Sequence, residues 1–200
     1  LNKHSLGNKA IAICADVSNA SQVKIMFEET KKHLGTVSLL VNNTGISQQK
    51  LFSDITEAEW DTMFSVNVKS MFLCCRQALT DMIHNKNGKI INISSMWGQV
   101  GASCEVHYSA SKAAVIGLTK ALAKEVGPSH IQVNCVAPGV IKTAMNSHLD
   151  KQTLEMLKEE TPLGVIGTTE DVAQMVGFLA SDHSDFITGQ VFGINGGMVI

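Results

Sequence analysis

The chain has 200 residues, of which 44% are hydrophobic and 17% are charged, and its formal net charge is −2. This length and balance are typical of one globular domain, residues 1–200, with a buried core. The near balance of 16 basic and 18 acidic residues excludes a general affinity for polyanions, and no apolar run is long enough to span a membrane, so we expect neither a nucleic-acid nor a membrane partner.

Short apolar runs rich in Val and Ile alternate with longer amphipathic stretches along the chain. The runs are bounded by Gly, Asn, Ser or Pro, which is typical of strands buried on both faces. In chain order, the predicted strands are residues 10–15, 37–41, 89–93, 131–136 and 191–194. Strands that alternate with helices indicate βαβ units, and they predict an α/β fold with a parallel sheet.

Helical stretches separate these strands. Ser18 or Asn19 is placed to cap the first helix, and Thr169, which is followed by acidic residues, suits the start of the last. The residues between 109 and 124 are small or apolar around most of the helix, which predicts contact with the sheet on one side and with another helix or subunit on the other. The predicted helices are residues 20–33, 57–85 (as two helices), 108–126, 151–160 and 169–180.

The cysteines and histidines suggest neither disulfides nor metal binding. No two of the five cysteines form a CxxC pair, and their odd number suits reduced thiols, so we expect a protein of the reducing cytoplasm. The seven histidines show no HExxH or paired spacing, so no metal site is expected. No apolar segment near the start resembles a signal peptide.

Polar side chains and glycines follow three of the predicted strands. These are the segments 42–45, 94–95 and 137–139. Ligands of an open α/β sheet bind at the carboxyl ends of the strands, so we expect the functional site there.

Ser95, Tyr108 and Lys112 have a spacing that suits acid–base chemistry. Tyr108 and Lys112 are four residues apart and share one face of a helix. A phenol titrates near pH 10, and a nearby ammonium lowers that pKa, so Tyr108 would protonate a developing alkoxide or accept its proton in reverse. Ser95, at a strand end, would hydrogen-bond the same oxygen. Taken alone, the Tyr–Lys pair is also compatible with a surface pair on an amphipathic helix.

Several motifs occur in one order along the chain: Asn42-Asn43-Thr44-Gly45, Asn67, Ser95, Tyr108-Ser109-Ala110-Ser111-Lys112, and Pro138-Gly139-Val140-Ile141-Lys142-Thr143. Together they resemble the short-chain dehydrogenase/reductase family, and within it the 3-oxoacyl-[acyl-carrier-protein] reductases. The resemblance implies a doubly wound, Rossmann-like fold of three αβα layers that lacks its first two strands in this numbering. The family's glycine-rich turn is also absent, so we expect a natural chain that is longer at its N-terminus by at least one βαβ unit.

The resemblance also assigns roles to residues. Tyr108 would be the acid/base, Ser95 would position the carbonyl, and Lys112 would lower the tyrosine pKa and hold the nicotinamide ribose. Asn67 would help to organise a water that links Lys112 to solvent. The residues implied in binding the cofactor, NADP in preference to NAD, are Asp16, Val17, Asn43, Gly45, Tyr108, Lys112, Pro138, Gly139, Ile141 and Thr143. Asp16 has an alternative role as a helix N-terminal acid, and Asn42 is expected to bridge strands.

Substrate specificity is expected in residues 144–165, a long connection that is interpreted as either a mobile lid or a plain solvated helix. The predicted substrate-binding residues are Ser95, Trp97, Met145 and Leu149, and Leu154 and Leu157 would add an apolar inner face. An acyl carrier protein is a further expected partner, although Thr44 and Val165 depart from the family pattern and Arg76 is the one arginine in the chain. Lys86 and Lys89 are the candidate basic contacts.

The leading hypothesis is an NAD(P)H-dependent reductase of a 3-oxoacyl thioester of the fatty acid synthesis type. Two alternatives stay open. One is an NAD-dependent alcohol or sugar dehydrogenase of the same family, and the other is a catalytically silent binding or assembly module. The apolar helix around residues 109–124, together with residues 57–85, resembles the helices that build the family's tetramer, so we expect a homotetramer, or otherwise a dimer.

Overall fold

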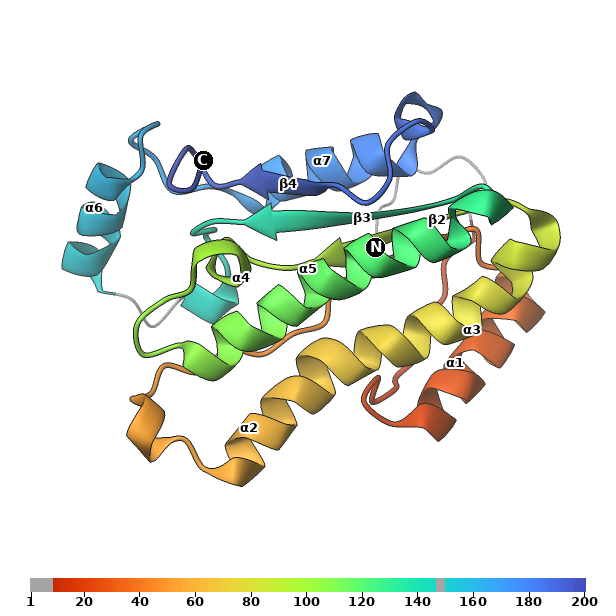
Figure 1. Ribbon diagram of the computed structural model, residues 1–200, viewed down its shortest axis with the longest axis horizontal. Coiled ribbons are helices and arrows are strands. Elements are labelled where there is room, and N and C mark those ends of the chain that lie inside the picture. Colours follow the sequence, from red (N-terminus) through yellow and green to blue (C-terminus); the bar gives the residue numbers. More distant parts are fainter. Residues whose placement is uncertain (1–8, 147–149) are drawn as a thin grey trace.

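In the computed structural model, which describes residues 9–146 and 150–200, four parallel strands form one sheet in the order β1-β2-β3-β4 (Figure 1). The strands are β1 (Leu39–Asn42), β2 (Gly88–Ile93), β3 (Ile131–Pro138) and β4 (Val191–Ile194). The register places Asn42 beside Asn92, and Pro138 beside Ile194. Since all four strands run in the same direction, their carboxyl ends meet at one edge of the sheet.

Helices follow the strands as the βαβ pattern predicts. A π-helical segment, Ser65–Lys69, joins α2 to α3, so residues 57–85 form two helices as expected. The helices are α1 (Ala20–Leu34), α2 (Glu57–Phe64), α3 (Ser70–Asn85), α4 (Trp97–Val100), α5 (Val106–Val126), α6 (Lys151–Glu160) and α7 (Thr169–Ala180). Short 3-10 turns lie at Phe52–Asp54, Gly127–Ser129, Ala144–Asn146 and Asp182–Ser184.

The two faces of the sheet are covered by different helices. Ile90 and Val133 pack with α3 and α5 on one face, whereas Ile91 and Val136 pack with α7 on the other. α1 lies against α3 (Figure 1). This alternation along β2 and β3 buries both faces of the central strands, which explains why the sequence there is continuously apolar.

The predicted strand at residues 10–15 is wrong for the described chain. These residues belong to no ladder, and every second side chain from Ala10 onward is exposed. A strand depends on hydrogen bonds to a neighbour, and β1 pairs only with β2 among the described strands. β1 is therefore an edge strand, with Leu39 39% and Val41 38% exposed.

The helix caps refine two predictions. Asn19 caps α1 by accepting hydrogen bonds from the backbone N–H groups of Ser21 and Gln22. Thr168, one residue before the predicted Thr169, caps α7 in a reciprocal capping box with Asp171. The acid three residues after the cap therefore fixes the helix start more closely than the first threonine of the helix itself.

Two features are absent from the part of the chain that the structure describes. No group of three or more His, Cys, Asp or Glu side chains in residues 9–146 and 150–200 is arranged to hold a metal ion. No helix in the same ranges is both long and apolar enough to cross a membrane. All five cysteines are free thiols.

Candidate active site

The carboxyl edge of the sheet brings the predicted polar segments together. The backbone N–H of Met96 donates to the carbonyl of Pro138 at 2.9 Å, and that of Gly139 donates to Ile194 at the same distance. These bonds join the segments that follow β2, β3 and β4. These segments therefore form one continuous line along the carboxyl edge of the sheet, which we call the rim.

Asn42 is a strand-bridging residue, as predicted. Its Nδ2 donates to Oδ1 of Asn92 at 2.8 Å, and Asn92 in turn donates to Oγ1 of Thr119 at 2.9 Å. Asn42 and Asn92 are buried, and so is Thr119 on α5. This row of buried polar groups fixes the height of α5 relative to β1 and β2, because an unpaired polar group would be costly there.

Helix α5 presents Tyr108 and Lys112 on the same buried face. Tyr108 is 8% exposed and Lys112 is 4% exposed, so the pair is not the surface pair of the alternative interpretation. The Lys112 Nζ lies 5.7 Å from the centroid of the Tyr108 ring. Ser95 follows β2 and is also buried, and its Oγ accepts a hydrogen bond from the Trp97 backbone N–H at 3.2 Å.

The ammonium of Lys112 is held by the end of β2. Its Nζ donates to the carbonyl oxygen of Ile93 at 3.0 Å. Burial lowers the pKa of Lys112 to about 8, because removal from water disfavours the charged form. Lys112 is therefore a buried cation whose proton is easier to release than that of an exposed lysine.

The expected direction of the Tyr108 pKa shift is wrong. Burial is the largest influence and raises the pKa of Tyr108, while hydrogen bonding with the Ser95 hydroxyl lowers it. Lys112 donates to Ile93 rather than to the phenol, which explains why its proximity does not reverse the shift. Removal from water outweighs the hydroxyl here, and burial is a quantity that residue spacing does not report.

Asn67 lies in the π-helical segment and is fully buried. Its Oδ1 accepts from the Ile46 backbone N–H at 2.8 Å, and its Nδ2 donates to the Ile46 carbonyl at 2.9 Å and to Ser111 Oγ at 3.0 Å. The Ser111 hydroxyl donates in turn to the carbonyl of Tyr108 at 2.7 Å. Asn67 thus ties the segment after β1 to the first turn of α5, at the kind of helix irregularity that often accompanies functional sites.

Two residues to which the sequence assigned no individual role also shape the site. The Ser94 hydroxyl donates to the backbone carbonyl of Lys112 at 2.7 Å. Gly98 on α4 lies against the same peptide, since a Cβ at this position would come within 2.7 Å of the Lys112 carbonyl carbon. Ser94 adjoins Ser95 in the sequence, which is a weak signal, whereas nothing in the sequence pattern marks Gly98.

The residues predicted to bind the cofactor fall into two groups. The first lies along the rim. A Cβ on Gly45 would come within 3.2 Å of Lys112 Nζ, so glycine leaves more room on this side of the ammonium than any other residue. Gly139 fits closely against Asn195, Asn43 and Thr143 are exposed, and the buried Ile141 side chain packs against Gly167. This open backbone next to Lys112 fits the close approach of a ribose and phosphate group.

The second group lies before α1. The exposed Asp16 carboxylate accepts hydrogen bonds from the backbone N–H and the hydroxyl of Ser18, at 2.9 and 2.7 Å. The Ser18 hydroxyl and backbone thereby lower the pKa of Asp16. Val17 packs against the apolar cluster around Val23 and Leu73. Asp16 therefore organises the turn that leads into α1, close to its alternative role, while Asn19 is the cap.

One predicted substrate residue lines a cavity. The cavity has a volume of about 510 Å³, and its lining residues are Trp97, Val100, Glu160, Met198, Val199 and Ile200. Met145 is 44% exposed and is not part of this lining, and Leu149 lies outside the described residues. Leu154 and Leu157 of α6 are half-buried.

A family model described as "Enoyl-(Acyl carrier protein) reductase" matches residues 2–199. The chain belongs to the short-chain dehydrogenase/reductase family, whose members are oxidoreductases that act on CH–OH groups with NAD or NADP.

The chain is also similar to individual proteins and to one solved structure. The chain is 42% identical, over 92% of its length and 75% of the relative's, to the 3-oxoacyl-[acyl-carrier-protein] reductase FabG of Thermotoga maritima. It is 38% identical, over 98% of its length and 80% of the relative's, to nodulation protein G of Rhizobium meliloti. A crystal structure of a candidate gluconate dehydrogenase from Agrobacterium tumefaciens matches with a TM-score of 0.93 and 30% identity, covering 97% of this chain and 78% of that one.

Proposed function

We propose that this chain catalyses the reduction of the keto group of a 3-oxoacyl thioester, with NADPH as the hydride donor. The observation that carries the proposal is the buried arrangement of Tyr108 and Lys112 on one turn of α5, with Ser95 at the adjoining end of β2. The similarity to a 3-oxoacyl-[acyl-carrier-protein] reductase supports the choice of substrate.

Each side chain has a defined part in the proposed reaction. The Ser95 hydroxyl donates a hydrogen bond to the carbonyl oxygen, which stabilises the negative charge that develops there. Tyr108 transfers its phenolic proton to this oxygen, so the ketone becomes an alcohol and Tyr108 becomes a phenolate. The bound cofactor supplies the hydride that forms the new C–H bond. The Lys112 ammonium stabilises the phenolate, and Asn67 helps to organise a water that links Lys112 to solvent and so resupplies the proton.

The cofactor would lie along the rim of the sheet. Gly45 and Asn43 would face its ribose and phosphate groups, and Lys112 would donate to the ribose hydroxyls. Pro138, Gly139, Ile141 and Thr143 would flank the nicotinamide. Asp16 and Val17 would face the adenine through the turn before α1, because the Val17 side chain itself is packed in the core.

The acyl chain would occupy the cavity lined by Trp97, with residues 144–165 as a lid over it. An acyl carrier protein is the proposed macromolecular partner, but Lys89 is unsuited to hold it. The Lys89 Nζ is bound to Asp185 at 2.6 Å and to the carbonyl of Ser181, and its side chain is only 12% exposed. Lys86 therefore remains as the candidate basic contact.

We also propose a homotetramer built through α5 and its neighbours. Ala113, Gly117 and Ala121 are spaced four residues apart on α5 and are exposed, so the second apolar side predicted for this helix is left uncovered by the described chain. Phe72 of α3 is also 49% exposed, and α3 and α5 lie in the same helix layer (Figure 1). Sedimentation at micromolar concentration tests this proposal, and a monomer would contradict it.

A second candidate, oxidation of a sugar or sugar-acid hydroxyl, is favoured by the similarity to the candidate gluconate dehydrogenase. Steady-state assays with acetoacetyl thioester and NADPH, against gluconate and polyols with NAD and NADP, separate the two. In the same assays, Tyr108→Phe is expected to reduce turnover at least about 100-fold while cofactor binding stays close to wild type. Turnover by Tyr108→Phe at the wild-type rate would refute the mechanism.

A further inference from the structure

The residue before the proposed acid is a fully buried histidine. His107 begins the buried stripe of α5 and is 0% exposed. Its Nε2 lies 2.9 Å from Oε1 of Gln48, a residue 59 positions earlier in the chain. Its Nδ1 has no hydrogen-bond partner. Buried polar atoms are rarely left unpaired, so the unpaired Nδ1 of His107 needs an explanation beyond simple packing.

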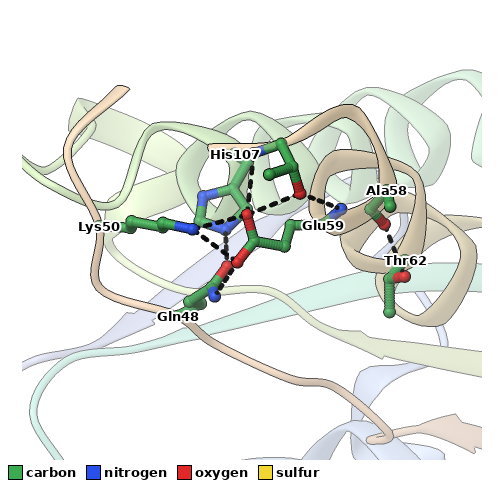
Figure 2. Close-up of polar contacts among 7 residues, drawn as sticks. Gln48, Lys50, Ala58, Glu59, Thr62 and His107 are labelled. Atoms are coloured by element: carbon green, nitrogen blue, oxygen red, sulfur yellow. Dashed lines mark hydrogen bonds and ion pairs between the residues drawn. The ribbon is translucent and has the colours of Figure 1, made fainter. Parts of the chain in front are cut away.

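The partners of Gln48 fix the direction of every hydrogen bond in this group. Gln48 Nε2 donates to Oε1 of Glu59 at 2.8 Å, and Lys50 Nζ donates to both oxygens of the same carboxylate at 2.8 Å (Figure 2). These donors, led by Lys50, hold the pKa of Glu59 far below its ordinary value. Because the Gln48 amide nitrogen faces an ionised acceptor, its oxygen must accept from His107, so Nε2 of His107 carries a proton.

The segment held in this way runs directly beside the proposed catalytic groups. Gly45 lies against Lys112 Nζ and Asn67, and the backbone of Ile46 makes two hydrogen bonds to the Asn67 side chain. At its far end, the Lys50 backbone N–H donates to the Cys104 carbonyl at 2.7 Å. Residues 45–50 are thus fixed to the π-helical segment at one end and to the region before α5 at the other, with His107 between.

We propose that His107 is a positioning residue: through Gln48 it holds residues 45–50 against α5 and so sets the place of Gly45 and Asn67 beside Lys112. Loosening this segment would shift the groups around the Lys112 ammonium. Small displacements of positioning groups can lower the reaction rate strongly. The activity readout of this proposal rests on the proposed function, whereas its structural readout does not.

The charged groups that face His107 act in opposite directions. Burial lowers the pKa of His107, Glu59 on α2 raises it, and Lys50 lowers it. Burial prevails, so the pKa of His107 is lowered from its ordinary value of 6.5 and the neutral form is favoured. Protonation would put a buried N–H on Nδ1 that has no acceptor, and the segment would then loosen at acidic pH.

The test compares His107→Leu, which removes the donor, with His107→Gln, whose amide nitrogen can replace Nε2. Gln48→Met removes the same hydrogen bond by replacing the half-buried partner of His107. This variant takes the place of His107→Leu in the test if His107→Leu does not fold. Thr168→Val is the control, because it breaks a capping box on α7, away from this segment. Amide hydrogen exchange of Ile46 and Lys50 is measured together with kcat and its pH profile on the full chain.

We expect Ile46 and Lys50 to exchange at least about tenfold faster in His107→Leu or Gln48→Met, with kcat lowered about tenfold, and His107→Gln to restore both. The fall of kcat at acidic pH, which protonation of His107 would cause, should disappear in His107→Gln. Exchange at wild-type rates in the donor-less variants, or an unchanged kcat with a lowered Tm, would overturn the proposal. If the wild type reduces no keto thioester, the proposed function fails, and the exchange rates alone decide the role of His107.

Discussion

The hydroxyl of Ser94 donates a hydrogen bond to the backbone carbonyl of Lys112 at 2.7 Å, and so joins the end of β2 directly to α5. Lys112 returns a bond to the same strand end, from its Nζ to the carbonyl of Ile93. The strand end that carries Ser95 and the helix that carries Tyr108 are therefore fixed to each other at two points. The distance between the serine hydroxyl and the phenol depends on both.

Ser94→Ala removes one of these two points. The variant is expected to lose about 1 kcal/mol of unfolding free energy and to lower kcat about threefold to tenfold, because α5 gains freedom relative to Ser95. Urea unfolding and steady-state assays measure the two effects. Ser184→Ala, which removes a buried serine bonded to a helix carbonyl away from the site, should cost similar stability without lowering kcat. Equal effects of both variants on kcat would show that the Ser94 bond has no special role.

Gly98 packs α4 on α5 at the same peptide. In Gly98→Ala the new Cβ would lie 2.8 Å from the Lys112 carbonyl oxygen, so α4 must move, and we expect a loss of about 1–3 kcal/mol in stability together with lower activity. Gly177→Ala is the matched control. It lies in α7 with no atom within 4 Å of a new Cβ, and is expected to gain about 1 kcal/mol from helix propensity. A Gly98→Ala protein as stable as Gly177→Ala would contradict the close packing.

The sequence predicted most of the parallel sheet, because runs of Val and Ile such as those in β2 and β3 are buried on both faces. The predicted strand at residues 10–15 is wrong, since strand pairing depends on a neighbour rather than on the segment itself. The spacing of Ser95, Tyr108 and Lys112 could be recognised in the sequence because it combines a strand end with one helical turn. The contacts of His107 were not, because they join residues 59 positions apart.

Replacement of Trp97 tests whether the cavity that it lines selects the length of the acyl chain. Trp97→Ala enlarges the cavity lined by Trp97 and Glu160, so the ratio of kcat/KM for long over short 3-oxoacyl thioesters should rise about tenfold. Trp60→Phe, which changes the other tryptophan in its stack on Phe64, should leave this ratio unchanged. The measurement is kcat/KM over a series of acyl chain lengths. A constant ratio in Trp97→Ala would place chain-length selection elsewhere.

The buried Lys112 ammonium is expected to lower the free energy of unfolding in the pH range where it takes part in the proposed reaction. Its pKa falls from 10.5 in the unfolded chain to about 8 in the fold, so the folded protein binds fewer protons than the unfolded one between these values. Stability then rises with pH across this window, and the penalty of burying the cation is fully present below pH 8, where it amounts to about 3 kcal/mol.

Lys112→Met removes the penalty but leaves the Ile93 carbonyl without its donor, at a cost of about 1–2 kcal/mol, so we expect a net gain of about 1–2 kcal/mol at pH 7 and a loss of turnover. The gain should shrink as the pH is raised from 8 towards 10, because the wild type is then relieved of its charge. Urea unfolding at several pH values measures it. Lys120→Met, an exposed lysine on the same helix, should show no such pH-dependent gain. A stability difference between Lys112→Met and wild type that stays constant from pH 7 to 10 would mean that Lys112 is not the buried cation described above.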